Sequence, residues 1–128
     1  AYERLMVARD ARGRRLEVHK LMQPEPLHTS PEEAAGVDAA EGTRPREAGV
    51  RLAASYVNFY LGTKRVVVPL LDSKRDGAAL RKLAVLFPGR EVVGVPGREI
   101  LLGGGNIHCI TQQVPAVRPR RAGKGDRG

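Results

Sequence analysis

The sequence contains few aromatic residues and almost no cysteine. Trp is absent and aromatic residues make up 4% of the 128 residues, so any core must be built from Val, Leu, Ile and Ala. The single cysteine, Cys109, excludes an internal disulfide. No apolar run is long enough to cross a bilayer, and the first residues do not read as a signal peptide. We therefore expect one modest cytoplasmic domain without a membrane partner.

The net charge of +8 is concentrated at one end of the chain. Half of it lies in residues 118–128, where five Lys and Arg residues face only Asp126. This stretch is rich in Gly and Arg and contains almost nothing apolar, so we expect a basic, disordered tail. A small nucleic-acid binder that uses this tail is an alternative. The sequence contains no DNA- or RNA-binding motif, however, and we expect no nucleic-acid partner.

The first half of the chain shows little regular patterning. Leu16–Leu21 alternates apolar and polar residues, which predicts a half-buried strand. Residues 22–52 are rich in Pro, Gly, Glu and Ala and predict a long loop. Within this loop a short helix is predicted over Ser30–Ala35, with Ser30 as the cap, Pro31 at the first position and Glu33 completing a capping box.

The second half predicts an α/β unit. Strands are expected over Ala54–Leu61 and Arg65–Leu71, joined as a hairpin, and the second has apolar residues on both faces. The capping-box spacing of Ser73–Asp76 predicts the start of a helix. Its apolar face is expected to comprise Leu80, Leu83, Ala84 and Phe87. Further strands are predicted over Glu91–Val95 and Ile107–Val114.

Three consecutive glycines, Gly103–Gly105, precede Asn106, Ile107, His108 and Cys109. No Gly-Lys-Ser/Thr follows, so the run is not a phosphate-binding P-loop, and His108 stands where a dinucleotide fingerprint needs its last glycine. What remains is a tight turn that delivers side chains at the start of the predicted last strand. Cys109 then has two interpretations, a small buried hydrophobe or a nucleophile that needs a donor-rich setting.

His108 is the obvious base for such a thiol, but neighbouring residues on a strand point to opposite faces. A base must reach hydrogen-bonding distance, so we expect His108 to be packed or bonded elsewhere. The other histidines, His19 and His28, lack metal-ligand spacing, and no metal site is expected.

Three segments carry a resemblance to a known family. They are Ala54–Tyr60 (ASYVNFY), Phe87–Gly94 (FPGREVVG) and Gly103–Gln113 (GGGNIHCITQQ). Together they resemble the C-terminal part of agmatine deiminases, in the bacterial peptidylarginine deiminase-type family, and the likeness runs from about Tyr2 to Pro115. The resemblance implies an α/β fold of the pentein type, a pseudo-fivefold propeller. Residues 1–117 would be the C-terminal part of the catalytic domain, with one complete strand–strand–helix–strand module and flanking strands.

The resemblance also implies a reaction that serves putrescine biosynthesis. Cys109 would attack the guanidinium carbon of agmatine, ammonia would leave, and water would release N-carbamoylputrescine without a cofactor. Asn58, Gly104, Gly105 and Asn106 would contact the substrate or shape its site. For Asn58, a hydrogen bond to a neighbouring backbone is the equal alternative.

The sequence departs from the family in one respect. The family's Gly-His-x-Asp motif and its guanidinium-binding acids lie upstream of the matched region, and no Gly-His pair occurs here. Four carboxylates cannot be assigned those roles from the sequence: Glu32, Glu33, Asp38 and Glu99. We expect an incomplete site. The alternatives are a peptidyl-arginine deiminase and an inactive remnant or interaction fragment, and the partners expected are a second copy or the absent propeller modules.

Overall fold

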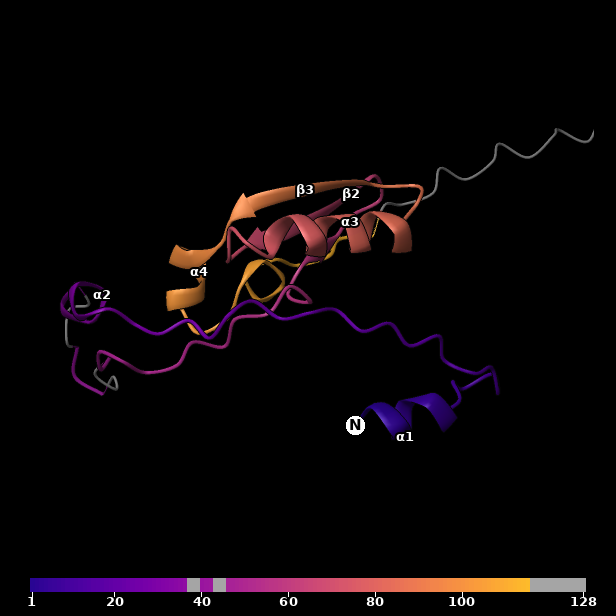
Figure 1. Ribbon diagram of the computed structural model, residues 1–128, viewed down its shortest axis with the longest axis horizontal. Coiled ribbons are helices and arrows are strands. Elements are labelled where there is room, and N and C mark those ends of the chain that lie inside the picture. The colour runs from indigo at the N-terminus through magenta and orange to yellow at the C-terminus, as the bar shows by residue number, and fades with distance from the viewer. Residues whose placement is uncertain (37–39, 43–45, 116–128) are drawn as a thin grey trace, which may run out of the picture.

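The computed structural model describes residues 1–36, 40–42 and 46–115 (Figure 1). The predicted basic tail and Asp38 lie outside these residues. The elements, in chain order, are α1 (Tyr2–Val7), α2 (Pro31–Ala35), β1 (Tyr60–Leu61), β2 (Arg65–Leu70), α3 (Asp76–Leu86), β3 (Glu91–Pro96), α4 (Arg98–Leu102) and the 3-10 helix η1 (Ile107–Ile110).

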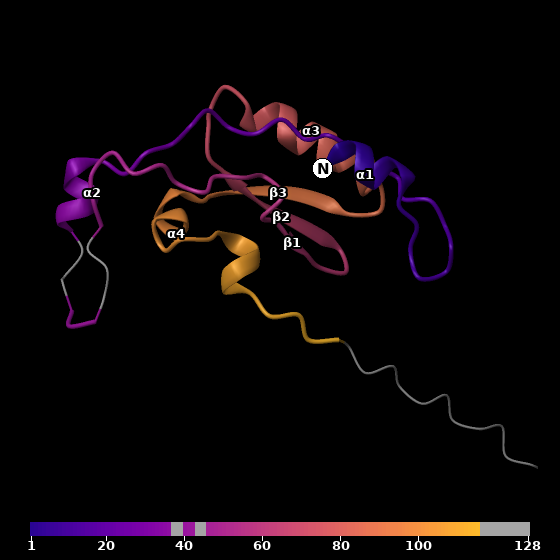
Figure 2. The same ribbon diagram turned by 90° about the horizontal axis from the view of Figure 1, so that it is seen from below.

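The three strands form one small mixed sheet in the order β1-β2-β3. β1 and β2 form the predicted hairpin and are antiparallel, whereas β2 and β3 are parallel and joined by α3. α3 packs on β3 and η1 packs on β2. Figure 2 shows α3 on one side of the sheet and α4 and η1 on the other. The strand–strand–helix–strand order predicted for this unit is confirmed, but the described residues contain no strand flanking it.

The core lies between β2 and α3. Val66 and Val68 of β2 are completely buried and pack with Ala79 and Leu83 of α3. Tyr56 completes this cluster. The other face of β2 is covered as well, since the adjacent residues Val68 and Pro69 are both buried and η1 packs on this strand, as its apolar pattern predicted.

α3 forms where its sequence predicted it, but it begins differently. The predicted capping box is wrong, because the N-cap residue is Arg75 and its side chain makes no capping bond. Instead the Asp76 carboxylate accepts hydrogen bonds from the backbone N–H of Leu71 and of Asp72. Ala84 is exposed, and Ala79 takes its predicted place on the buried face.

Three predicted strands are wrong in whole or in part. Leu16–Leu21 is not a strand, since alternation without a partner strand leaves backbone groups unpaired. Of Ala54–Leu61 only the last two residues pair, because the chain turns where the Asn58 N–H bonds the Ser55 carbonyl. The predicted strand Ile107–Val114 is replaced by η1, whose first turn is capped by the Asn106 side chain.

The predicted long loop doubles back on itself. Backbone hydrogen bonds join Thr29 to Val50 and Leu52 to Leu27, so its two arms run side by side with α2 near the tip (Figure 2). α2 matches its prediction, with the reciprocal capping bonds of Ser30 and Glu33. The loop is therefore a two-armed projection from the core.

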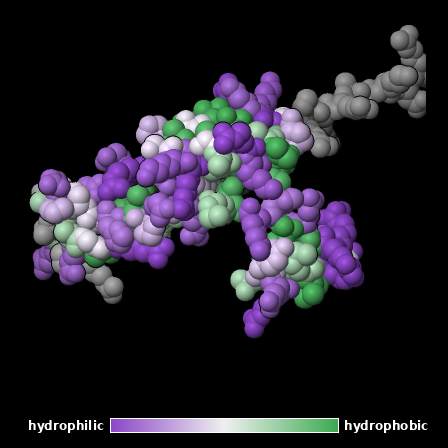
Figure 3. All heavy atoms as spheres, in the orientation of Figure 1, coloured by the Kyte–Doolittle hydropathy of each residue, from purple (hydrophilic) through white to green (hydrophobic). Residues whose placement is uncertain are grey.

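The N-terminal residues contribute little to the core. α1 buries none of its residues and lies apart from the sheet in Figure 1. Figure 3 shows apolar surface on this part of the molecule. Its large exposed side chains are Tyr2, Leu5, Met6 and Val7. No helix in the described ranges is long and apolar enough to cross a membrane.

Candidate active site

The glycine run forms the turn between α4 and η1. Gly103 ends α4 as its C-cap, and Gly104 follows with φ +95. That left-handed backbone disfavours any side chain, although space beside Gly104 is open. The turn reverses the chain so that η1 returns toward the sheet.

Gly105 is required for a different reason. A Cβ built there would lie 2.7 Å from both Cβ and Sγ of Cys109. No carbon fits at that distance, so the cysteine side chain occupies the space that a larger residue would fill. The sequence predicted that Gly105 shapes the site, and the structure shows that it makes room for the sulfur.

Asn106 fixes the start of η1 from inside the protein. Its side chain is buried, its Nδ2 donates to the Gly97 carbonyl at 3.0 Å, and its Oδ1 accepts from the Ile107 N–H at 2.9 Å. A Cβ at Gly97 would meet both this amide and Pro69. The described structure thus gives Asn106 a supporting place, and substrate contact by Asn106 stays a prediction.

Cys109 is a free, exposed thiol on η1. Asn58, 51 residues earlier, donates from Nδ2 to its Sγ at 3.2 Å. The pKa of Cys109 is lowered, first by this side-chain hydrogen bond and next by the backbone of Asn106, against the opposing effect of burial. Of the two interpretations of the thiol, exposure excludes the buried hydrophobe. The geometry favours a reactive thiolate.

Of the two interpretations of Asn58, the hydrogen bond to a neighbouring backbone is confirmed, and substrate contact stays a prediction. Its Oδ1 accepts from the His108 N–H at 2.9 Å while Nδ2 contacts the sulfur. It therefore bonds a neighbouring backbone and also lies in the candidate site. Nothing in the sequence signalled this contact except a polar residue within an apolar, aromatic run.

His108 lies on the 3-10 helix η1 and not on the predicted strand. The argument that His108 and Cys109 point to opposite faces of a strand therefore does not apply. On η1 its side chain is exposed and makes no hydrogen bond within the described residues, so the expectation that it is packed or bonded is wrong. Its backbone N–H is held by Asn58 instead. That His108 is not the base stays a prediction.

Among the described residues, no carboxylate bonds the Cys109 sulfur. Glu33 binds Arg98 through two hydrogen bonds, of 2.6 Å and 2.9 Å, and Glu32 accepts from Ser30. Glu99 is exposed on α4. The described ranges contain no cluster of three His, Cys, Asp or Glu residues that could hold a metal.

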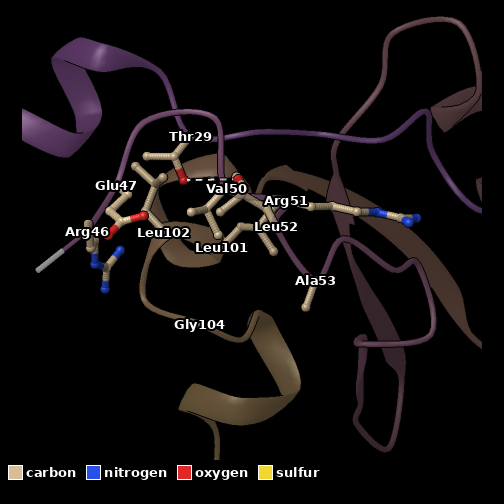
Figure 4. Close-up of a pocket in the computed structure, with 10 residues that line it drawn as sticks. All are labelled: Thr29, Arg46, Glu47, Val50, Arg51, Leu52, Ala53, Leu101, Leu102 and Gly104. Atoms are coloured by element: carbon tan, nitrogen blue, oxygen red, sulfur yellow. Dashed lines mark hydrogen bonds between the residues drawn. The ribbon is translucent and has the colours of Figure 1, made fainter. Parts of the chain in front are cut away.

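A cavity of about 550 Å³ lies beside the nucleophile loop (Figure 4). It lies between the second arm of the long loop and α4, and Gly104 contributes to its wall. In Figure 4 the side chains of Arg46 and Glu47 lie at one end, whereas that of Arg51 extends away from the others. Cys109 does not line this cavity. The sulfur is reached from open surface.

Known proteins resemble this chain over the stretch that contains Cys109. Residues 1–115 match the family described as Porphyromonas-type peptidyl-arginine deiminase. The chain belongs to this family.

Among its relatives, the agmatine deiminase of Ectopseudomonas mendocina (strain ymp) is 59% identical over 108 residues, which are 84% of this chain and 29% of that protein. The solved structure of the agmatine deiminase of Enterococcus faecalis is 43% identical with a TM-score of 0.80, and the match covers 89% of this chain and 31% of that one. The chain thus spans about a third of the length of these relatives. Their fold over this stretch is the α/β unit described above.

Proposed function

We propose that this chain supplies the nucleophile of an agmatine deiminase. The observation that carries the proposal is the exposed Cys109 thiol, held by the Asn58 amide on a glycine turn that has room for the sulfur. A thiolate is the nucleophile needed here, because a guanidinium is permanently charged and a poor electrophile.

The reaction proceeds in two steps. The Cys109 thiolate attacks the guanidinium carbon of agmatine, a C–S bond forms, and one C–N bond breaks as the nitrogen takes a proton and leaves as ammonia. Water then attacks the carbon of the thiouronium adduct and loses both of its protons, one of which replaces the proton that ammonia took. The C–S bond breaks with its electron pair returning to sulfur as the thiolate, and N-carbamoylputrescine departs. Gly104 and Gly105 shape the space through which the substrate approaches the sulfur. Asn58 contacts the sulfur, and Asn106 holds the start of η1.

The chain provides only half of this site. Binding a guanidinium needs carboxylates, and adding water needs a base. Glu32 and Glu33 are bonded to Ser30 and Arg98, and the sequence contains no Gly-His pair. We therefore infer that the isolated chain does not turn over agmatine. It would act with further propeller modules beside its own β1–β2–α3–β3 module, or with a second copy.

Two substrates fit this chemistry. The relative at 59% identity is named for agmatine, whereas the family description names peptidyl-arginine. We favour agmatine because the more similar proteins carry that name, and we place the reaction in the cytoplasm. An inactive remnant or interaction fragment is the alternative outside catalysis.

The test is a graft into a whole enzyme. The stretch of the Enterococcus faecalis agmatine deiminase that matches this chain is replaced by residues 1–115, and ammonia release from agmatine and from a peptidyl-arginine is measured. We expect release from agmatine, and a loss of about 1,000-fold or more in a Cys109→Ser variant, since a nucleophile has no substitute.

Three controls define the outcome. Circular dichroism shows that the graft is folded. A folded graft that releases no ammonia, or one in which Cys109→Ser keeps its rate, contradicts the proposal. The free 128-residue chain is assayed beside its own Cys109→Ser variant, and release above that variant would show that the chain alone is a complete enzyme.

A further inference from the structure

We propose that Asn58 acts together with Cys109 in catalysis, holding the reacting sulfur with its amide nitrogen and the backbone of the nucleophile helix with its amide oxygen. This inference rests on the proposed function, because it concerns the same sulfur. It goes further in naming the group that stabilises the thiolate.

The orientation of the Asn58 amide is fixed by a neighbour. An asparagine amide has a donor end and an acceptor end. The His108 N–H bonds Oδ1 at 2.9 Å and also the Asn58 backbone carbonyl at 3.3 Å. Because Oδ1 must face that N–H, Nδ2 is turned toward Sγ, 3.2 Å away. The donor end therefore always faces the sulfur.

The Asn58 amide offers a hydrogen-bond partner to each protonation state of the thiol. A thiolate accepts from Nδ2, and a protonated thiol has Oδ1 as an acceptor at 3.7 Å. The first contact is the shorter, and a hydrogen bond to an ionised group is stronger than one between neutral groups. The pair therefore favours the thiolate, which agrees with the lowered pKa of Cys109.

The turn that carries Asn58 is also anchored to the protein interior. Two residues earlier, the completely buried Tyr56 donates its hydroxyl to Asp76 at 2.7 Å. The Asn58 N–H donates to the Ser55 carbonyl and closes a turn from Ser55 to Asn58 that contains Tyr56. A donor on a fixed turn stabilises a charge without having to reorganise.

No other donor side chain bonds the sulfur among the described residues. Gly105 lies against it without a side chain, and His108, the adjacent titratable residue, makes no side-chain hydrogen bond there. The backbone of Asn106 contributes, but every variant at position 58 retains it. Asn58 is therefore the side chain whose removal should change the thiol.

The first test measures thiol reactivity in the full chain. Cys109 is the only cysteine, so the rate of alkylation by iodoacetamide reports this sulfur alone. The pH profile is recorded for the wild type, Asn58→Asp, Asn58→Ala and His108→Gln. Asp keeps the oxygen that accepts from His108 but replaces the donor by a carboxylate that repels a thiolate, whereas Ala removes the donor without adding a charge. A rise in both variants therefore assigns the effect to the lost donor.

We expect the midpoint of the profile to rise in both Asn58 variants, and most in Asn58→Asp. A rise of one pH unit slows alkylation at pH 7 about tenfold, and the rates converge once all thiols are ionised. His108→Gln should follow the wild type. An Asn58→Asp profile that coincides with the wild type, or an equal shift in His108→Gln, would overturn the proposal.

The second test needs no variant and decides the question if the variants do not fold. The chain contains two asparagines, Asn58 and Asn106, so ¹⁵N-asparagine labelling gives two side-chain amide pairs. The Asn58 pair should shift with pH at the alkylation midpoint, whereas the Asn106 pair, bonded to Gly97, serves as the internal control. An Asn58 pair that does not follow the thiol titration contradicts the proposal.

Both readouts are independent of agmatine. If Asn58 controls the thiol but the graft does not turn over agmatine, the proposed function fails, while the stabilisation of the Cys109 thiolate by Asn58 stands. If the graft is active but the reactivity of the thiol does not depend on Asn58, the proposed function stands and this inference fails.

Discussion

The buried hydrophobic side chains of the described structure all lie between Tyr56 and Ile107, whereas residues 1–52 bury only Pro24 and Thr29 within their described ranges. The later region has a sheet, a covering helix and the candidate site. Leu21 of the earlier region packs against the core, and polar contacts attach the rest. Arg75, the N-cap residue of α3, bonds the Gln23 carbonyl and pairs with Glu25, and Arg98 bonds Glu33 and the His28 carbonyl.

This difference shows which part of the chain determines the geometry of the sulfur. Asn58, Gly105 and Cys109 all lie in the later region, next to its buried core, and η1 packs on the central strand. Apolar burial holds its surroundings tightly because a packed interior leaves few alternative arrangements. Polar attachments at the surface contribute less, since water competes for them. Three experiments test this contrast.

The largest expected effect comes from matched leucine truncations in the two regions. Leu83 is 2% exposed in the core and Leu5 is 44% exposed on α1. Leu83→Ala should lower the free energy of unfolding by about 2–5 kcal/mol, because it removes buried methyl groups and leaves a cavity. Leu5→Ala should change it by less than about 0.5 kcal/mol. Urea denaturation followed by circular dichroism measures both, and similar losses would show that the regions do not differ.

A smaller effect is expected inside the site. Gly105→Ala places a carbon 2.7 Å from the Cys109 side chain, so the loop must shift at a cost of about 1–3 kcal/mol. Alkylation of the thiol should change as well, since the sulfur is displaced.

The matched control is Gly89→Ala, just after α3. A Cβ at this position would meet open space, with no neighbouring atom within 4 Å, so the stability of the variant should stay within about 0.5 kcal/mol of the wild type. Equal effects of the two variants would contradict the close contact at Gly105.

The smallest effect concerns the attachment of the long loop. The Arg98 guanidinium lowers the pKa of Glu33, so the attachment is complete above the ordinary carboxyl pKa and is lost as pH falls through the lowered one. The protection of the amides of residues 28–36 against hydrogen exchange, relative to the intrinsic exchange rate at each pH, should therefore fall about two- to fivefold toward acid pH, while β2 stays protected. In Glu33→Gln this protection should be low at every pH.

Glu32 provides the control for this experiment. The pKa of its carboxyl is also lowered, through a backbone hydrogen bond and the Ser30 hydroxyl, but it does not bond Arg98. Glu32→Gln should keep the acid dependence. If Glu32→Gln removes that dependence and Glu33→Gln does not, the ion pair is not the attachment.

The sequence predicted elements whose signals are local. The Ser30–Glu33 capping box, the amphipathic α3 and the apolar β2 each follow from residues a few positions apart, and each is confirmed. The errors arose where the deciding partner is distant. The Tyr56 turn is anchored by Asp76, and η1 is capped by Asn106, whose amide is fixed by Gly97. The alternation of apolar and polar residues over Leu16–Leu21 does not indicate whether a partner strand lies beside this segment.

The candidate site divides in the same way. The sequence by itself determined which sulfur is the candidate nucleophile and that a turn precedes it, because Cys109 is the only thiol and consecutive glycines indicate a backbone that side chains would obstruct. Only the tertiary structure decided that the Asn58 amide meets the sulfur and that Glu33, among the described carboxylates, binds Arg98 instead. Hydrogen bonds between residues 51 positions apart depend on how a buried sheet brings two segments together, which no local pattern encodes.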